Sequence, residues 1–110
     1  MMPMIILHVL ATYKRDEGLL FEERLRQVVG EATLLPGCTR YEWFRSPRHD
    51  CQVFICGEFE SEDAFLQYQK GPIVKMIGEQ LIPLLAASLT FKLSTFARSF
   101  WNRVDDGPRG

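Results

Sequence analysis

The sequence predicts a ferredoxin-like α+β fold, a βαββαβ chain whose four strands form one antiparallel sheet in the order 4-1-3-2. Segments with strand and helix periodicity follow one another as strand, helix, strand, strand, helix, strand. The first and third strands are apolar on both faces, so we expect them at the centre of the sheet, with the second and fourth at its edges. The right-handed crossover rule, applied to both strand-helix-strand units, then gives the order.

The first half of the chain begins with a buried strand and an amphipathic helix. Residues 4–13 are almost continuously apolar and rich in β-branched and aromatic types, which is typical of a strand buried on both faces. From Glu17 onward, apolar side chains recur every three or four positions and predict a helix with one apolar face. Pro36 and Gly37 cannot continue this helix, so it ends before them.

A β-hairpin follows the first helix. Residues 38–46 alternate, with Tyr41 and Trp43 on one face. A polar loop begins at Pro47, and residues 51–59 form the return strand. We therefore expect these two strands to be neighbours in the sheet.

The second half of the chain repeats the helix and strand pattern. Ser61 is a good N-cap, and the acidic residues after it favour a helix start. Gly71 and Pro72 interrupt the helix, which then resumes and ends near Pro83. Residues 88–96 alternate as the last strand, and periodicity is lost after Ala97. We therefore expect one domain over residues 1–97 and a tail over residues 98–110.

Composition excludes several classes of function. The 13 basic and 14 acidic residues almost cancel, so the chain lacks the charge expected of a protein that binds nucleic acid. It contains no apolar run of the roughly 20 residues that cross a membrane, and no secretory signal precedes its first strand, so we expect a cytoplasmic protein. The three cysteines and two histidines lack metal-ligand spacing, and the glycines form no phosphate loop. We expect neither a metal nor another cofactor.

The predicted fold has a consequence for assembly. Both helices cover one face of the sheet, while the central strands also supply large apolar side chains to the other face. Leaving that face in water would cost free energy comparable to the stability of a whole domain. We therefore expect a homodimer that packs sheet to sheet. Each subunit should keep a cavity between its own sheet and helices.

Short stretches of the chain resemble a known family. Residues 36–38, Tyr41, residues 58–65 and residues 84–85 are similar to the antibiotic biosynthesis monooxygenase family of dimeric α/β barrels, and the resemblance covers about residues 4–96. It implies the fold above, a homodimer and a ligand cavity between helices and sheet. Members of that family oxidise polycyclic aromatic phenols or quinols with molecular oxygen and without flavin or metal. Others degrade haem, act as isomerases or have no assigned activity.

The chain departs from the family at three positions. Many quinol-oxidising relatives have a histidine where this chain has Tyr68, and a second where it has Ile73. The haem-degrading branch has a histidine near the position of Gly78. None of these histidine roles transfers to this chain, and we expect no haem binding.

Several residues are candidates for chemistry. Histidine side chains titrate near neutral pH, so His8 is a candidate general base, although a lone strand histidine also fits a core or interface role. Tyr68 is placed to bond a quinol oxygen or to act as a spacer between helix and sheet. Tyr41 and Trp43 form either an aromatic wall for a ring substrate or ordinary core packing. Glu58 lies among apolar neighbours, so it either pairs with an arginine or handles a proton.

The leading interpretation is a cofactor-independent monooxygenase that acts on a reduced aromatic or quinol-like molecule with O2. In it, His8 and Tyr68 are catalytic, while Tyr41, Trp43 and Glu58 bind substrate. The alternative is a homodimer of the same fold that binds a small ligand or serves an accessory role without catalysis. The missing helix histidines are the evidence for this alternative.

Overall fold

The four strands form one antiparallel sheet in the order β2-β3-β1-β4, which confirms the predicted order read from the opposite edge. The computed structural model describes residues 4–96, so the predicted tail at 98–110 lies outside the described residues. The main elements are β1 (Met4–Thr12), α1 (Gly18–Thr33), β2 (Cys38–Arg45), β3 (Gln52–Phe59), α2 (Glu62–Lys70), α3 (Pro72–Met76) and β4 (Thr90–Phe96).

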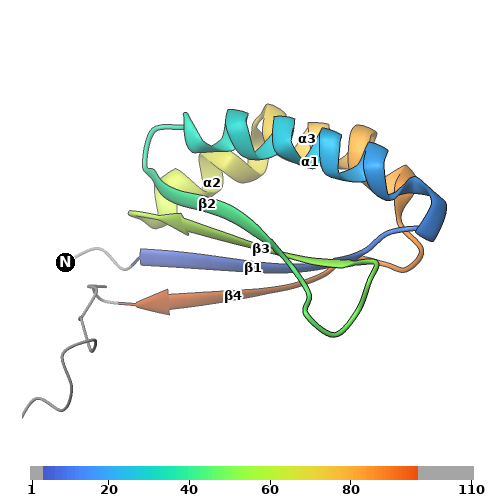
Figure 1. Cartoon of the computed structure of the whole chain (residues 1–110). Helices are drawn as coiled ribbons and strands as arrows, with labels where there is room; N and C mark the ends of the chain where they lie inside the picture. The colour runs from blue at the N-terminus through green and yellow to red at the C-terminus, as the bar shows by residue number, and fades with distance from the viewer. Residues whose placement is uncertain (1–3, 97–110) are drawn as a thin grey trace, which may run out of the picture.

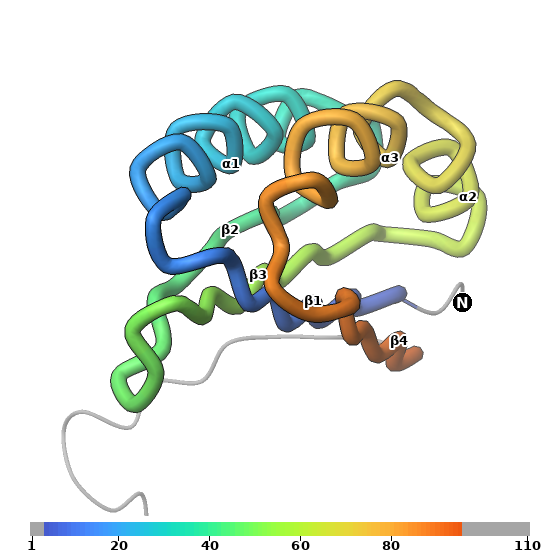
Figure 2. The backbone as a smooth tube through the Cα atoms, turned by 90° about the vertical axis from the view of Figure 1, so that its right-hand side faces the viewer, coloured from blue at the N-terminus to red at the C-terminus, as the bar shows by residue number. Residues whose placement is uncertain are grey.

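The helices lie on one face of the sheet, and within residues 4–96 no helix covers the other face, as predicted (Figure 1). Viewed along the strands, β4 is the strand farthest from the helices (Figure 2). We call the side of the sheet that α1, α2 and α3 cover the helical face, and the opposite side the helix-free face.

Alternation along the central strands divides their side chains between these two faces. On β1, Ile5 and Leu7 are buried on the helical face, whereas Ile6 is only half-buried on the helix-free face. Two large aromatic side chains lie directly opposite each other on the helix-free face: Phe44 is 53% exposed and Phe54 is 44% exposed. The helix-free face therefore carries the uncovered apolar surface that the sequence predicts.

The helix α1 supplies one side of the core. Its apolar stripe is buried at Phe21, Leu25, Val28 and Ala32, as the spacing predicts. The turn into β2 is made by Gly37, whose φ of 81° lies in the left-handed region. A Cβ at this position would come within 2.5 Å of the Ala64 Cβ. The glycine thus allows the end of α1 to approach the start of α2.

The second helical region is divided into several short elements. Ser61 caps α2, since its side-chain oxygen accepts a hydrogen bond from the Ala64 amide at 3.1 Å. The predicted break at Gly71 is confirmed. Beyond α3 the chain continues as a π-helical turn, η2 (Ile77–Leu81), and a 3₁₀ turn, η3 (Ile82–Leu84), which the sequence pattern did not indicate.

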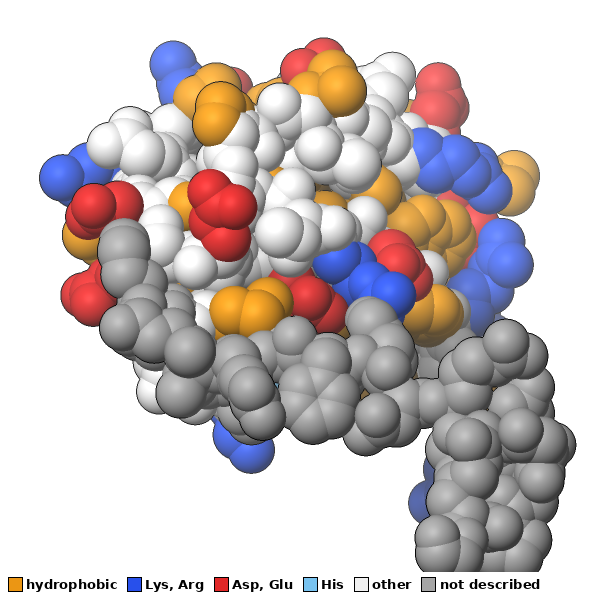
Figure 3. Space-filling model, turned by 90° about the vertical axis from the view of Figure 1, so that its left-hand side faces the viewer, with side chains coloured by type: hydrophobic (Ala, Val, Ile, Leu, Met, Phe, Trp, Pro, Cys, Tyr) orange, Lys and Arg blue, Asp and Glu red, His pale blue; other side chains and the backbone are white. Residues whose placement is uncertain are grey.

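The surface carries charges of both signs. Figure 3 shows acidic, basic and hydrophobic side chains intermixed over the end of the molecule where β1 begins. Within residues 4–96, no helix is long and apolar enough to cross a membrane. Over the same residues, no group of three or more histidine, cysteine or acidic side chains is arranged to hold a metal ion.

Candidate functional site

A cavity of about 260 Å³ lies between the helical face of the sheet and the second helical region. Its floor includes Leu7 and Val9 of β1, and its roof includes Ile77 and Leu81 of η2. This is the position predicted for a ligand cavity. Alternate residues of β1 point toward the helices and form one wall of the cavity. Apolar side chains of the helical turns form the opposite wall.

The walls of the cavity are almost entirely apolar. Among the described residues that line it, Tyr68 and Gln69 carry polar side chains, and every other lining side chain is apolar. Gln69 is exposed, whereas Tyr68 is only 4% exposed. Tyr68 is therefore the buried polar group that a ligand in the cavity can contact.

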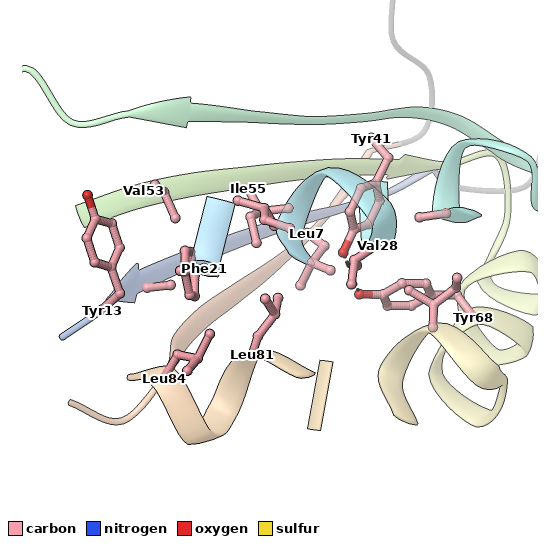
Figure 4. Packing of buried hydrophobic residues seen from close by; sticks show 14 of the residues in the cluster. Leu7, Tyr13, Phe21, Val28, Tyr41, Val53, Ile55, Tyr68, Leu81 and Leu84 are labelled. Atoms are coloured by element: carbon pink, nitrogen blue, oxygen red, sulfur yellow. Dashed lines mark hydrogen bonds between the residues drawn. The ribbon is translucent and has the colours of Figure 1, made fainter. Parts of the chain in front are cut away.

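Tyr68 shares a hydrogen bond with Tyr41. Their hydroxyl oxygens are 3.0 Å apart, and both side chains are buried (Figure 4). Tyr68 is carried by α2 and Tyr41 by β2, so this bond joins the helical layer to an edge strand. Gly57 lies opposite Tyr41 on β3, and a Cβ there would come within 3.1 Å of the Tyr41 ring. The missing side chain at Gly57 leaves room for Tyr41.

One of the two tyrosine hydroxyl protons is not used in the hydrogen bond between Tyr41 and Tyr68. Each phenol carries one O–H donor, and a single bond between the two uses one of them. Because Tyr68 lines the cavity and Tyr41 lies outside it, the hydroxyl proton available to a ligand is that of Tyr68 when Tyr41 donates. A ligand with an acceptor oxygen is the natural partner for this proton.

Burial controls the ionisation of both tyrosines. It raises the pKa of Tyr68 above the ordinary 10.0, although the hydrogen bond from Tyr41 acts in the opposite direction. Burial also raises the pKa of Tyr41 far above its ordinary range, and the neighbouring Tyr68 adds to this effect. Both phenols are therefore neutral at physiological pH, and Tyr68 acts as a hydrogen-bond donor.

The structure does not bring His8 to the cavity. We expected His8 within the fold, but it is exposed on the helix-free face, where it pairs across the sheet with Cys56 and Lys92. Strand alternation explains the difference, because Leu7 and Val9 point into the cavity and the residue between them must point away.

Glu58 also lies on the helix-free face. Its carboxylate is 3.9 Å from the Arg40 guanidinium, which in turn is 3.1 Å from Glu42. The side chain of Glu58 is only 14% exposed, so a charged partner offsets part of its desolvation. Of the two roles considered for Glu58, pairing with an arginine is the one that the structure contains. Glu58 does not line the cavity.

Trp43 shares the helical face with Tyr41 but has different neighbours. The Arg26 and Arg45 guanidinium carbons lie 5.8 and 5.4 Å from the centre of a Trp43 ring. Trp43 is therefore held in a cation-π arrangement outside the cavity. Of the five predicted site residues, Tyr68 lines the cavity and Tyr41 contacts it through Tyr68; the other three lie elsewhere.

The apolar wall of the cavity was not among the predicted site residues. It includes Phe91 and Leu93 of β4 and Ile77 of the π-helical turn. The alternation of β4 was visible in the sequence, and it placed Phe91 and Leu93 on one face. What the sequence lacked was a sign of which face of β4 points toward the helices and so lines the predicted cavity.

Comparison with protein families gives one match over most of the described chain. The family model described as "Antibiotic biosynthesis monooxygenase" matches residues 4–80. No curated protein matches the sequence.

Several solved structures have the same fold. A Nitrosomonas europaea protein described provisionally as an antibiotic biosynthesis monooxygenase has a TM-score of 0.79 at 14% identity, covering 86% of this chain and 90% of its own. A similarly described protein from Caulobacter crescentus has a TM-score of 0.78 at 18% identity, with 84% and 89% covered. A Bacteroides thetaiotaomicron protein of unknown function, described as a possible oxidoreductase, has a TM-score of 0.76 at 17% identity, with 84% and 97% covered. At these identities the similarity establishes the fold.

Proposed function

Because this chain belongs to the antibiotic biosynthesis monooxygenase family, we propose that it is a cofactor-independent monooxygenase for a reduced aromatic or quinol-like molecule. The observation that supports this most directly is the apolar cavity, whose described lining residues include one buried hydroxyl, that of Tyr68. An aromatic ring fits such walls, and one phenolic oxygen can accept the Tyr68 proton.

The cavity offers two contributions to oxygenation. Apolar walls exclude water, which strengthens hydrogen bonds and protects reactive intermediates. Tyr68 donates to the substrate oxygen and favours its ionised form, because a hydrogen bond to a phenolate is stronger than one to a phenol. Since Tyr68 itself remains neutral, the substrate loses its proton to solvent or to oxygen-derived species rather than to a base in the wall.

The reaction balances without an added reductant. For an anthrone, the methylene carbon loses two hydrogens and gains one oxygen atom, and the second oxygen atom leaves as water. The substrate supplies all four electrons that reduce O2. The protein therefore contributes binding, orientation and electrostatic stabilisation, and requires no electron carrier.

The second candidate function is binding of the same ligand class without catalysis. The observation that favours it is the lining of the cavity, because the described lining residues include no histidine, acidic or basic side chain. Under this candidate, the Tyr68 hydroxyl fixes the orientation of a bound phenol or carbonyl compound, and O2 plays no part.

The proposal includes a homodimer formed through the helix-free face. Phe44 and Phe54 are adjacent there and half exposed, and the half-buried Ile6 and Leu10 extend the apolar surface along β1. A second copy that presents the same surface can cover all of these side chains. The cavity lies on the opposite face of the sheet and stays open to ligand.

Oxygen uptake with a panel of anthrones and naphthoquinols tests the oxygenase. We expect turnover above the rate of autoxidation, rising with pH as the substrate phenol ionises. Tyr68→Phe should lower kcat/KM by about 100- to 1,000-fold, as loss of one donor to a developing anion does. Tyr13→Phe, a matched change outside the cavity, should leave it unchanged, and His8→Ala tests the base predicted from sequence.

The result also separates the two candidates. Binding of the same compounds by calorimetry, without uptake above autoxidation, would favour the binding protein. A large loss of turnover in His8→Ala with none in Tyr68→Phe would contradict the assignment of the polar group to Tyr68.

A further inference from the structure

A strip of exposed apolar side chains begins inside the cavity and continues onto the surface. Phe91 is 68% exposed, Leu93 is 44% exposed and Val74 is 37% exposed, and all three also line the cavity. We call these three residues, Phe91 and Leu93 on β4 together with Val74 on the neighbouring helix α3, the β4 strip. They are apolar, and Phe91 and Leu93 are two residues apart on one face of β4.

The strip is exposed because of where β4 lies. As an edge strand it is the strand farthest from the helices (Figures 1 and 2), and its side chains Phe91 and Leu93 are partly exposed. The strip is also on the opposite face from Phe44 and Phe54. A dimer formed through the helix-free face therefore leaves the β4 strip uncovered. Large exposed apolar side chains gathered in one place usually mark a binding surface, so the strip requires another partner.

We propose that the β4 strip binds a hydrocarbon chain carried by the ligand whose oxygen-bearing ring lies at Tyr68. The ligand class is then an alkyl-substituted phenol or quinol. This inference rests on the proposed function only in taking the cavity as the ligand site, and it holds for either candidate function.

The size of the cavity favours a ligand that extends beyond it. At about 260 Å³, it is smaller than the roughly 300–1,000 Å³ of sites that enclose drug-sized ligands. A ligand head smaller than a drug-sized molecule, such as a naphthol ring system, suits a space of this order. A longer substituent can leave the cavity past Phe91, Leu93 and Val74, which line it and are exposed to solvent.

The chemistry of the strip selects the substituent. A charged or strongly polar group lying on these side chains would lose hydration without gaining a partner. A saturated chain would instead bury their exposed surface together with its own. The strip is continuous with the cavity wall, so a single ligand can occupy both.

Binding of 6-alkyl-2-naphthols tests the proposal. The hydroxyl and the alkyl group lie at opposite ends of this ring system, so one end can reach Tyr68 while the chain points outward. Phe91 and Leu93 are about 7 Å apart along the strand, which roughly five methylenes span. Because the strip covers only one side of the chain, we expect Kd to fall roughly two-fold per methylene over this length and then level off.

Variants in the full chain locate the effect. Phe91→Ser and Leu93→Ser should each flatten the dependence of Kd on chain length, with little change for 2-naphthol itself. Tyr68→Phe should weaken all members of the series by a similar factor and leave that dependence intact. The matched control is Phe54→Ser, which removes an exposed phenylalanine from the helix-free face and should keep the chain-length dependence.

Three results would overturn the proposal. One is a Kd independent of chain length, and another is a dependence that Phe91→Ser leaves unchanged. The third is a change in molar mass by light scattering on Phe91→Ser, because this would make the strip a contact between protein copies. Oxygen uptake is read separately, with the anthrones and naphthoquinols. Turnover of those compounds together with a Kd independent of chain length removes only this inference. Chain-dependent binding of the naphthols without turnover of the anthrones and naphthoquinols removes only the oxygenase.

Discussion

The buried hydroxyl pair of Tyr41 and Tyr68 links single residues to the pH dependence of stability. In the folded protein, burial raises both pKa values above 10.0, the ordinary value they regain on unfolding. A raised pKa means that the folded state holds its proton more tightly. The contribution of the two protonated tyrosines to the stability of the fold is therefore complete below pH 10 and is lost as the pH rises above that value.

We predict that the urea midpoint of unfolding falls steeply above pH 10. Each of these two tyrosines should contribute up to about 1.4 kcal/mol of lost stability per pH unit. Tyr68→Phe should remove one of the two contributions and make the decline shallower. A decline of equal steepness in the wild type and in Tyr68→Phe would show that other groups dominate.

A second residue-scale prediction concerns Gly37. Gly37→Ala forces a side chain into a left-handed backbone conformation and against Ala64, at 2.5 Å. We expect a loss of roughly 2 to 4 kcal/mol in the free energy of unfolding. Gly30→Ala is the control, because it lies within α1 with no atom within 4 Å of the added Cβ. It should stabilise the protein by about 0.5 to 1 kcal/mol, and urea denaturation measures both.

At the scale of elements, α2 positions the polar group of the cavity. Ser61→Ala removes the cap of α2 and should cost about 1 kcal/mol, lowering the melting temperature by about 4 °C or more. Ser61→Asp should restore it, and Ser88→Ala, in an exposed loop, should have no effect. An equal loss from Ser61→Ala and Ser88→Ala would mean that the cap does not hold α2.

The elements also show how far sequence reasoning reaches. Tyr41 and Trp43 were correctly placed on one face, and Ser61 at a helix start, because alternation and capping are local properties. His8 was misplaced because β1 is apolar on both faces, so its pattern gives no sign of which parity points toward the helices. The ion pair of Glu58 with Arg40 joins two strands, and the contact of Trp43 with Arg26 joins a strand to α1. No local pattern encodes either contact.

At the scale of the whole molecule, the helix-free face sets the predicted assembly. We expect a dimer by light scattering at micromolar concentration. Phe54→Lys should weaken association by roughly 100- to 1,000-fold, because two copies of a partly buried aromatic side chain are lost from a symmetric contact. Phe91→Ser, on the other face, should leave the mass unchanged. A wild-type protein that runs as a monomer would contradict the assembly.

The alternation of β1 makes the sheet a partition one backbone thick. Leu7 lines the cavity, whereas His8, its immediate neighbour, lies on the surface proposed for a second subunit. Under these proposals, adjacent residues of β1 serve different functions. A library randomised at the cavity-facing positions Leu7, Val9 and Ala11 should alter ligand preference and leave subunit recognition intact. The complementary library would do the reverse.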